Sequence, residues 1–295
     1  MSITKQNLTA IIVTFKSENV IHNCIRSIDS EIKILVVDNS NNIKFKENLE
    51  KEYKNVKCLL SSENLGMGAG NNLGLKYVKT DFAFILNPDV ILEDDAIKEL
   101  IEKSKDLQSF GIIAPIEINQ NFPNFKRDKT SSNNFELLTP FTVKSVDGYA
   151  MVLNLKKLNQ IDKFYYFDEN FFMYLENDDL CKRLKDNNEK IYIIPSSRIK
   201  HLGGKAVDET YKYEMELSRN WHWIWSKFYF NKKHYGYFFA LINGLPTFIS
   251  SVLKFLFNLM INNNQKKKIY LNRVMGFVNA LAGKKSHLRP KINDQ

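Results

Sequence analysis

The densest group of reactive side chains in this sequence is the segment 176–179, where three acids, Glu176, Asp178 and Asp179, stand around Asn177. Like charges at this spacing repel one another, and the partial positive charge at a helix N-terminus tolerates them best. Their crowding can raise the pKa of one carboxyl group toward the range of a general base. The segment therefore predicts the start of a helix over 180–185, and either a catalytic base or simple compensation of the helix dipole.

A second candidate site is the tripeptide Asn87-Pro88-Asp89, which ends the apolar run 82–86. In extended backbone, side chains two residues apart point to the same side, and proline stiffens the segment between them. A hard carboxylate oxygen at Asp89 suits Mg²⁺ or Mn²⁺ bound against a diphosphate. The alternative is a helix N-cap before the next helix.

Two further side chains occupy comparable positions. Asp38 follows the apolar residues ILVV, where its carboxylate could accept a hydrogen bond from a pyrimidine N–H or form a turn. His201 follows the apolar run 191–195 and precedes Gly203 and Gly204, which would let the chain bend toward a metal or a phosphate. A lone histidine also occurs as a structural residue, so its role as a ligand depends on its neighbours.

The segment 64–72 (NLGMGAGNN) is rich in glycine. Glycines allow a close approach of backbone to a ligand and leave N–H groups free for a phosphate. A dinucleotide-binding loop is excluded, because its GxGxxG fingerprint follows the first strand, and here the last glycine is replaced by Asn71. A phosphate-facing loop and a plain glycine turn both remain open.

The elements that would position these residues alternate along the first part of the chain. Apolar runs at 8–15, 32–37, 56–60 and 82–86 predict buried strands, and segments near 20–28, 70–78 and 94–105 predict helices. This order is typical of an α/β fold with a mostly parallel sheet flanked by helices. Ligands of such sheets bind beyond the carboxyl ends of the strands, where Thr14, Asp38, Asn64 and Asp89 lie. Strands at 146–155 and 191–195 follow an exposed polar loop over 117–142.

Composition indicates one catalytic domain with an extension, since the chain has 295 residues, 44% of them hydrophobic and 25% charged. We expect the domain at residues 1–210 and a helical extension at 211–295. The three cysteines form no CxxC pair, which argues for a reducing compartment. The polar N-terminus lacks the apolar core of a signal peptide, so we expect a cytoplasmic protein.

The extension combines apolar, aromatic and basic segments. Residues 237–253 carry no charge, and much of the formal net charge of +9 lies at 265–295. This pairing fits an anionic membrane surface better than a nucleic acid, with the C-terminal helices lying in the inner-leaflet interface. A soluble helical pair packed on the domain or in a dimer is the alternative. Upstream aromatic residues would favour the interface, namely Trp221, Trp223, Trp225, Phe228, Tyr229 and Tyr235.

The motifs VVDNS, NLGMGAGNNLG, LNPDV, FFMYLENDDLCKRL and HLGGKA occur in this order. Together they resemble family 2 glycosyltransferases, especially the bacterial rhamnosyltransferase-like branch. The resemblance covers residues 8–235, including Arg219 and Lys227. It implies a GT-A fold and an inverting, metal-dependent transfer of a sugar.

The resemblance also implies roles for individual residues. Asp38 would bind the pyrimidine, Asp89 would bind Mg²⁺ or Mn²⁺, and His201 would be a further metal ligand. The family commonly has Glu-Asp-x-Asp with the second residue as the base; here that residue is Asn177, so Asp178 or Glu176 could substitute, and Asp179 matches the last acid. The remaining donor-site residues would be Thr14, Phe15 and Glu18 around the base, and Asn64, Gly66, Asn71 and Asn87 in the donor pocket.

The expected reaction is a single displacement on a dTDP- or UDP-sugar, with dTDP-L-rhamnose preferred through the resemblance. The acceptor would be a saccharide, one linked to polyprenyl diphosphate suiting the C-terminal segment, in the synthesis of cell-surface polysaccharide. Two other functions are considered. A non-catalytic nucleotide-sugar-binding module of the same fold is left open by Asn177. A nucleotidyltransferase ranks lowest, because it would have a basic glycine-rich loop where this chain has Thr14-Phe15-Lys16-Ser17.

Overall fold

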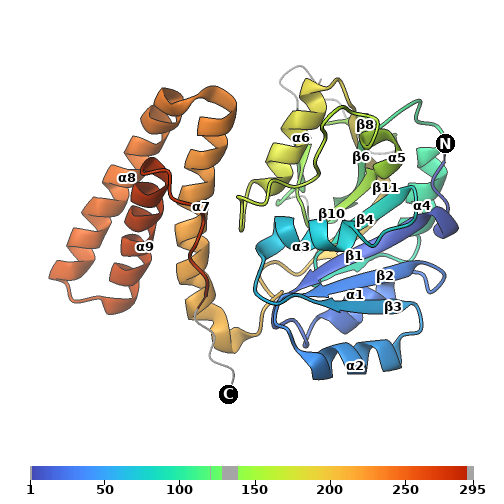
Figure 1. The fold of residues 1–295 in the computed structure, drawn as a ribbon, viewed down its shortest axis with the longest axis horizontal. Coiled ribbons are helices and arrows are strands. Elements are labelled where there is room, and N and C mark those ends of the chain that lie inside the picture. Colours follow the sequence, from blue (N-terminus) through green and yellow to red (C-terminus); the bar gives the residue numbers. More distant parts are fainter. Residues whose placement is uncertain (1, 120, 128–138, 291–295) are drawn as a thin grey trace. The chain divides into compact units, whose positions relative to one another are not determined.

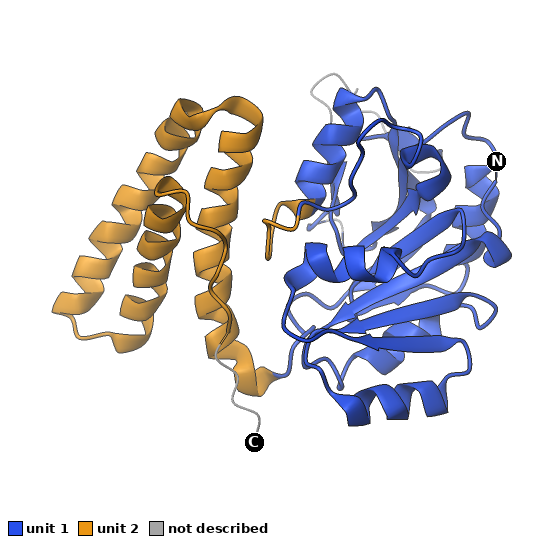
Figure 2. Ribbon diagram, viewed as in Figure 1, with its two compact units in different colours: residues 1–168, 177–208 blue, residues 169–176, 209–295 orange. Residues whose placement is uncertain are grey.

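The computed structural model describes residues 2–119, 121–127 and 139–290. It divides into two compact units, shown in different colours in Figure 2. The α/β unit comprises Met1–Asp168 and Asn177–Asp208, and the helical unit comprises Glu169–Glu176 and Glu209–Gln295. The central part of the predicted polar loop, 128–138, and the basic tail from residue 291 onward lie outside the described residues.

The first half of the α/β unit is a parallel sheet in the order β3-β2-β1-β4, covered by helices (Figure 1). Alternate residues of a strand face opposite sides, so Ala10 and Ile12 of β1 belong to one apolar layer and Ile11 to the other. The elements are β1 (Leu8–Thr14), α1 (Ile21–Ser27), β2 (Lys33–Asp38), α2 (Ile43–Glu52), β3 (Val56–Leu60), α3 (Gly66–Leu75) and β4 (Phe82–Leu86), after a short helix η1 (Lys5–Asn7).

The second half makes the sheet mixed. β10 pairs antiparallel with β4 and β6, β6 pairs parallel with β11, and β5 and β8 pair antiparallel with β11. The elements are β5 (Val90–Leu92), α4 (Ala96–Ser104), β6 (Ile112–Glu117), β8 (Phe141–Thr142), β10 (Ala150–Asn154), α5 (Leu155–Leu158), α6 (Glu176–Asp186) and β11 (Ile191–His201), with β7 (Phe125–Lys126) and β9 (Ser145–Val146) forming a small separate sheet. The predicted α/β fold with flanking helices is confirmed, although its sheet contains several antiparallel pairs.

Two predicted boundaries are wrong in ways that matter for the site. β11 continues past residue 195, through an irregularity between Ile194 and Arg198, and ends at His201. His201 is therefore held in a sheet, opposite Val90 of β5, rather than in a glycine bend. Helix α3 begins at Gly66 instead of Gly70, so the glycine-rich segment is helical rather than a turn.

The helical unit consists mainly of α7 (Lys212–Tyr235), α8 (Tyr237–Met260) and α9 (Asn264–Leu281), preceded by a short helix η2 (Glu209–Tyr211). Gly236, with φ of 91°, separates the first two long helices, and the Asn263 side chain caps the third. α8 runs unbroken through Asn243, Gly244 and Pro246. A Cβ atom at Gly244 would collide with the Phe277 ring, so this glycine permits close packing of α8 on α9.

The core of the helical unit corrects the predicted interfacial role of its aromatic residues. Trp221, Trp225 and Phe228 are only 2–3% exposed and pack with Phe277 in this core. Tyr229 is partly buried against the same cluster. Among the aromatic residues named for the membrane, Trp223 and Tyr235 are exposed, at 44% and 48%.

Candidate active site

The loops after β1 and β2 are linked by polar contacts that continue the parallel pairing of the two strands. Thr14 lies opposite Asp38 in the register, and both side chains are about 1% exposed. Beyond Thr14 and Asp38, the residues two positions further along the two loops are hydrogen-bonded to each other, and so are the residues four positions further. The contacts are Thr14 Oγ1 to Asp38 Oδ1 (3.1 Å), Lys16 N to Ser40 Oγ (2.8 Å) and Asn42 Nδ2 to Glu18 Oε1 (3.2 Å).

Asp38 holds its own loop together. Its Oδ1 also accepts a hydrogen bond from the Ser40 backbone N–H (3.2 Å), and its Oδ2 accepts one from Asn42 N (2.9 Å). Each carboxylate oxygen has two lone pairs, so Oδ2 keeps capacity for another donor. Asp38 thus forms a turn, and it still has an acceptor site that a base N–H could use. Phe15 lies beside this turn, where its N–H donates to Ser17 Oγ (3.1 Å).

Asn39 is a site residue that the sequence analysis did not single out. Its side chain is 4% exposed, and its Nδ2 donates to the carbonyl oxygen of Gly66 at 3.1 Å. Its Oδ1 accepts from Ser61 Oγ (3.1 Å), and Asn64 Oδ1 accepts from Gly66 N (3.1 Å). Asn39 therefore fixes the start of α3, and its only sequence signal was its position directly after Asp38.

The glycines of α3 serve packing more than ligand approach. A Cβ atom at Gly70 would lie 2.8 Å from Val13 Cγ1, and one at Gly74 would lie 2.7 Å from Ile11 Cγ2. Both distances are too short for real contacts, so these glycines let α3 lie directly on β1. Gly68 is also inside the helix. Gly70 lies one turn into α3, where its N–H belongs to the helix, whereas Gly68 lies in the first turn, whose N–H groups have no partner within a helix, so a phosphate-facing N–H at Gly68 stays a prediction.

Asn71, on the same helix, is 2% exposed, and its Oδ1 has no hydrogen-bond partner among the described residues. A buried amide oxygen without a partner costs about 1–3 kcal/mol. Asn87 has the same feature, because its Oδ1 is also buried without a partner in the part of the chain that is described. Both side chains therefore fit a ligand that supplies hydrogen-bond donors.

Asp89 lies in a turn rather than in extended backbone. The turn joins β4 to β5 and is closed by a hydrogen bond from Val90 N to Asn87 O (3.2 Å). The Asp89 side chain is 1% exposed, and its Oδ1 is 3.3 Å from His201 Nε2. Neither carboxylate oxygen accepts a hydrogen bond from any described residue. A buried carboxylate in this condition is costly unless a cation or another donor satisfies it.

The surroundings of His201 fix its orientation. Its backbone N–H donates to Glu117 Oε2 (2.8 Å), and the Tyr149 ring stacks on the imidazole with centroids 4.0 Å apart. Leu202 N donates to Asp89 O (3.0 Å), which ties the end of β11 to the turn. Burial, with the nearby charges of Asp147, Glu117 and Asp89, raises the pKa of Tyr149. The sequence analysis missed Glu117 and Tyr149, which stand far from His201 in the chain and belong to no recognisable motif.

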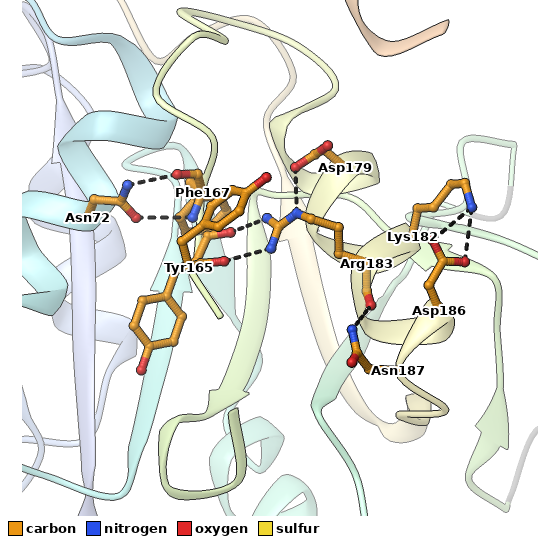
Figure 3. A network of polar contacts seen from close by, with 9 residues as sticks. Asn72, Tyr165, Phe167, Asp179, Lys182, Arg183, Asp186 and Asn187 are labelled. Atoms are coloured by element: carbon orange, nitrogen blue, oxygen red, sulfur yellow. Dashed lines mark hydrogen bonds and ion pairs between the residues drawn. The ribbon is translucent and has the colours of Figure 1, made fainter. Parts of the chain in front are cut away.

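Asp179 is a structural anchor. Its side chain is fully buried, and its Oδ2 accepts from Arg183 Nε at 2.8 Å. Figure 3 shows that the same guanidinium also binds the backbone carbonyls of Tyr165, at 2.6 Å, and Tyr166. Asn72 of α3 exchanges two hydrogen bonds with the Phe167 backbone (2.9 and 3.1 Å). Segment 165–167 is thereby fixed to both α6 and α3.

Asp178 is more accessible than Asp179. Its side chain is 13% exposed, and Lys126 Nζ lies 2.8 and 2.7 Å from its two oxygens. Asn177, at the family's usual base position, donates instead to Val146 O (2.8 Å). Glu176 begins α6 and is 9% exposed, but it belongs to the helical unit.

A fourth carboxylate lies near this group. Burial raises the pKa of Asp147, and the charge of Asp178 raises it further, while Lys126 and His201 lower it. The neighbouring Gly148 permits close packing on Asn177, because a Cβ atom there would be 3.2 Å from Asn177 Cβ. The sequence analysis assigned residues 146–155 only to a strand and so missed Asp147.

The residues present fit one divalent cation. Within residues 2–119, 121–127 and 139–290, no three His, Cys, Asp or Glu side chains converge as metal ligands. Asp89 and His201 would therefore supply two protein ligands, and diphosphate oxygens and water would supply the others, as is usual for Mg²⁺. The unpaired oxygens of Asp89 are the observation that supports this fit.

Comparisons with known proteins agree on one family. The family model described as "Glycosyl transferase family 2" matches residues 9–174. The low-salt glycan biosynthesis hexosyltransferase Agl10 of Haloferax volcanii is 27% identical over 220 residues, which cover 69% of each chain. The rhamnosyltransferase WbbL of Escherichia coli is 23% identical over 220 residues, 65% of this chain and 81% of WbbL.

Solved structures share the fold at lower identity. A mannosyltransferase of Pyrobaculum calidifontis, PcManGT, in complex with GDP-Man and Mn²⁺, superposes with a TM-score of 0.56 at 11% identity, covering 95% of this chain and 88% of that one. GalNAc-T7 with UDP, GalNAc and Mn²⁺ gives a TM-score of 0.51 at 15% identity over 72% of this chain. This chain spans about half of GalNAc-T7, 51% of its length.

Proposed function

The chain belongs to glycosyl transferase family 2, whose model matches residues 9–174, and we propose that it transfers a sugar from a nucleoside diphosphate donor with inversion at the anomeric carbon. It is a glycosyltransferase by this membership. The observation that carries the proposed mechanism is the buried Asp89 carboxylate, 3.3 Å from His201 Nε2, with no hydrogen bond to either oxygen.

Asp89 and His201 would hold a Mg²⁺ or Mn²⁺ ion, which neutralises the diphosphate and stabilises the departing nucleotide. Contacts within the α/β unit fix the positions of these two metal-binding residues. Glu117 accepts the His201 backbone N–H, and Tyr149 stacks on the imidazole. The pairing of β5 with β11 then sets the separation of the two ligands without any loop having to close.

The linked loops after β1 and β2 would bind the nucleoside. Asp38 would use its remaining acceptor capacity on Oδ2 for a pyrimidine N–H, and Thr14 and Glu18 would hold the loops that carry it. Phe15 would lie against the base. Asn64, Gly66, Asn71 and Asn87 would line the donor pocket, the last two through amide oxygens without partners among the described residues.

We assign the general base to Asp178, with Glu176 as the second candidate. Asp179 is committed to Arg183 and has no exposed surface, whereas Asp178 is partly exposed and lies in the same unit as Asp89. In the step itself, the acceptor hydroxyl gives its proton to this carboxylate while its oxygen bonds to C1. The bond from C1 to the phosphate oxygen breaks, and the nucleoside diphosphate leaves with that electron pair.

For the donor we propose dTDP-L-rhamnose, with UDP-sugars as the alternative. The likeness to the rhamnosyltransferase WbbL supports the first, and the likeness to the hexosyltransferase Agl10 supports a hexose more generally. The acceptor would be a saccharide hydroxyl, on a polyprenyl-diphosphate-linked chain, in the synthesis of cell-surface polysaccharide.

A donor screen tests this assignment. Thermal stabilisation by each nucleotide sugar, with and without Mn²⁺, should be largest for dTDP-L-rhamnose with the metal. Asp89→Asn should lose the metal-dependent part, while Asp94→Asn, a change at an exposed acid nearby, should keep it. Nucleotide release should then need an acceptor. Stabilisation of equal size without Mn²⁺, and in Asp89→Asn, would show that the metal site is wrongly placed.

We further propose that the protein works at the inner face of the cell membrane, with α8 lying in the lipid interface. α8 is 24 residues long, with a mean hydropathy of 1.5 in its most apolar window, of which 11% is buried. Its inner face, which includes Ala240, Ser251 and Asn258, is buried, and the helix packs on α7 and α9. Its outer face is apolar along its length, exposing Phe238, Phe239, Ile242, Leu245, Ile249, Leu253, Leu256, Phe257, Leu259 and Met260.

α8 has the length of a spanning helix, but its packing favours an in-plane position. α9 lies along it and carries Lys266, Lys267, Lys268 and Arg273. Crossing the bilayer would take Arg273, near the middle of α9, into hydrocarbon, at a cost of about 3 kcal/mol at the centre. In the interface each basic side chain near anionic headgroups instead gains about 1 kcal/mol.

Vesicle flotation decides the question. The protein should float with vesicles of phosphatidylglycerol and phosphatidylcholine, and less with phosphatidylcholine alone or in high salt. Ile242→Asp, at a site that is 68% exposed on α8, should abolish flotation, whereas Ile43→Asp, 62% exposed in the α/β unit, should not. Absence of flotation at low salt, or equal loss in both variants, would exclude this membrane face.

A further inference from the structure

The segment that leads into the acidic cluster is folded as part of the helical unit. Phe171 and Phe172 are 0% and 3% exposed. Residues 171–173 each contact α7, which lies about 50 positions further along the chain. The contacts are Phe171 edge-on to Tyr229 (centroids 4.9 Å apart), Phe172 against His222 (4.6 Å) and Met173 O accepting from Ser226 Oγ (2.8 Å).

The two residues that follow have an unusual backbone. Tyr174 and Leu175 have φ of 70° and 67°, in the left-handed region that non-glycine residues seldom adopt. Each such residue costs about 1–3 kcal/mol and persists only where its surroundings enforce it. At Tyr174, the ring is held in place by an edge-on contact with Trp223 of α7, with centroids 5.4 Å apart. Glu176, the first residue of α6, comes directly after this strained pair.

A C-terminal strap, residues 284–290, fixes α7 from the other end of the sequence. Trp225 Nε1 donates to Lys284 O (3.0 Å), and His222 Nε2 donates to Leu288 O (2.9 Å). Because a carbonyl only accepts, Nε2 carries the proton, and His222 Nδ1 then accepts from Ser286 Oγ (2.9 Å). Three hydrogen bonds thereby join the strap to two residues of α7, His222 and Trp225.

The strap also contacts the aromatic segment directly. The guanidinium of Arg289 lies 3.9 Å from the centroid of the Phe172 ring, a cation–π distance. Its Nη1 donates to the carbonyls of Ser286 and Leu288 (3.1 and 3.0 Å), so the guanidinium is oriented by the strap itself. Phe172 is therefore held between His222 and Arg289.

We propose that α7 and the strap form a clamp that positions Glu176, the second candidate for the base, with Arg289 as a positioning residue for the transfer reaction. The clamp stabilises the strained pair at Tyr174 and Leu175, which aims the chain into the acidic cluster. The link to turnover rests on the proposed transferase function, whereas the clamp itself does not.

Hydrogen exchange measures the clamp without any activity. Arg289→Ala should speed exchange in the peptide 169–178 by about two- to fivefold, the effect of losing a cation–π contact made by an exposed arginine. Arg289→Lys should give a smaller change, because an ammonium keeps the charge but not the planar stacking. Arg273→Ala is the matched control: its guanidinium binds Asn220 Oδ1 (2.6 Å) and lies 5.8 Å from the Tyr270 ring, both within the helices.

Kinetics measure the consequence. Arg289→Ala should lower kcat by about two- to fivefold while leaving KM for the donor unchanged, and Arg273→Ala should change neither. Unchanged exchange at 169–178 in Arg289→Ala would overturn the clamp. Faster exchange with an unchanged kcat would overturn the positioning role. Should no nucleotide sugar give transfer even by the wild type, the proposed function fails, and exchange alone still decides whether the clamp exists.

Discussion

In the α/β unit, polar side chains are buried near the carboxyl ends of the strands, whereas in the helical unit apolar side chains are exposed along α8. Asp38, Asn71 and Asp89 are 1%, 2% and 1% exposed, while Phe238 and Met260 are 78% and 84% exposed. An exposed apolar face is unfavourable for an isolated protein, and so is a buried polar group without a hydrogen bond, as at Asn71 Oδ1 and both oxygens of Asp89. The two arrangements are the observations behind the two proposals made above, a charged ligand in the first unit and a lipid surface on the second.

The buried polar groups also differ in whether they have an ion-pair or hydrogen-bond partner. Asp179 is paired with Arg183, and His222 is hydrogen-bonded on both ring nitrogens. Asp89 has neither kind of partner beyond the long contact to His201. A buried polar group that has hydrogen-bond partners stabilises the fold. A buried polar group without a partner is expected to stabilise the complex with a ligand that supplies one. The first three predictions separate these two cases.

The largest effect should follow Asp89→Asn. We expect transfer to fall by at least ~10²-fold, the typical cost of losing one charge-stabilising group. The unliganded protein should meanwhile become more stable, by about 1 kcal/mol or about 3 °C, because a neutral amide replaces a buried unpaired carboxylate. Turnover and unfolding temperature should be measured on the same preparation. A variant that loses stability and activity together would place Asp89 among the structural groups.

Asp179→Asn should show the opposite pattern. Removing one partner of a buried ion pair leaves the Arg183 charge uncompensated, which costs about 3 kcal/mol or more in the free energy of unfolding. Asp178→Asn should instead leave stability within about 0.5 kcal/mol and lower turnover by ~10²-fold or more. Urea unfolding and initial rates distinguish the two. If Asp178→Asn keeps wild-type turnover, Glu176→Gln is the next base candidate to test.

His222 predicts a pH dependence of the helical unit. Burial lowers its pKa from 6.5 to about 4, with the charges of Arg289 and His287 also lowering it and the Leu288 carbonyl opposing them. The unfolded chain binds a proton below pH 6.5, and the folded chain does not until about pH 4. The stability from neutral His222 is therefore complete above pH 6.5 and is lost as the pH falls toward 4, up to about 3 kcal/mol in all.

Urea unfolding of wild type and His222→Gln, compared at pH 7.5 and pH 4.5, isolates this contribution. The gap between the two proteins should be larger at pH 7.5 and should narrow as the pH falls. An equal gap at both pH values would mean that His222 does not stay neutral in the fold.

Gly70→Ala should give the smallest effect. Its new Cβ would press on Val13 of β1, and overpacking of this kind costs about 1–3 kcal/mol. If nucleotide affinity falls in Gly70→Ala without any loss of stability, the glycine contacts the ligand after all.

The sequence by itself determined strands β1 to β4 of the α/β unit and the positions of the reactive groups at their ends. The apolar runs of the first part of the chain are buried, and β1 to β4 were predicted within two residues, whereas β5 to β9 were not predicted. Polar residues at the ends of such strands must meet at one edge of the sheet, which is why Thr14 and Asp38 were placed together correctly. The family, too, could be identified from the ordered motifs, because each motif is a contiguous run of residues that can be read without the fold.

Tertiary structure decided what each of those residues touches. Gly70 was predicted to face a phosphate and faces Val13 instead, because helix packing depends on which strand lies beneath it. Trp221 and Trp225 were predicted for a membrane and are buried, since a three-helix unit needs its largest side chains as a core. The acids at 178 and 179 are neighbours of the same type, yet one faces Lys126 and the other Arg183. Their difference arises because consecutive helix positions are about 100° apart, and the surroundings on each side come from distant parts of the chain.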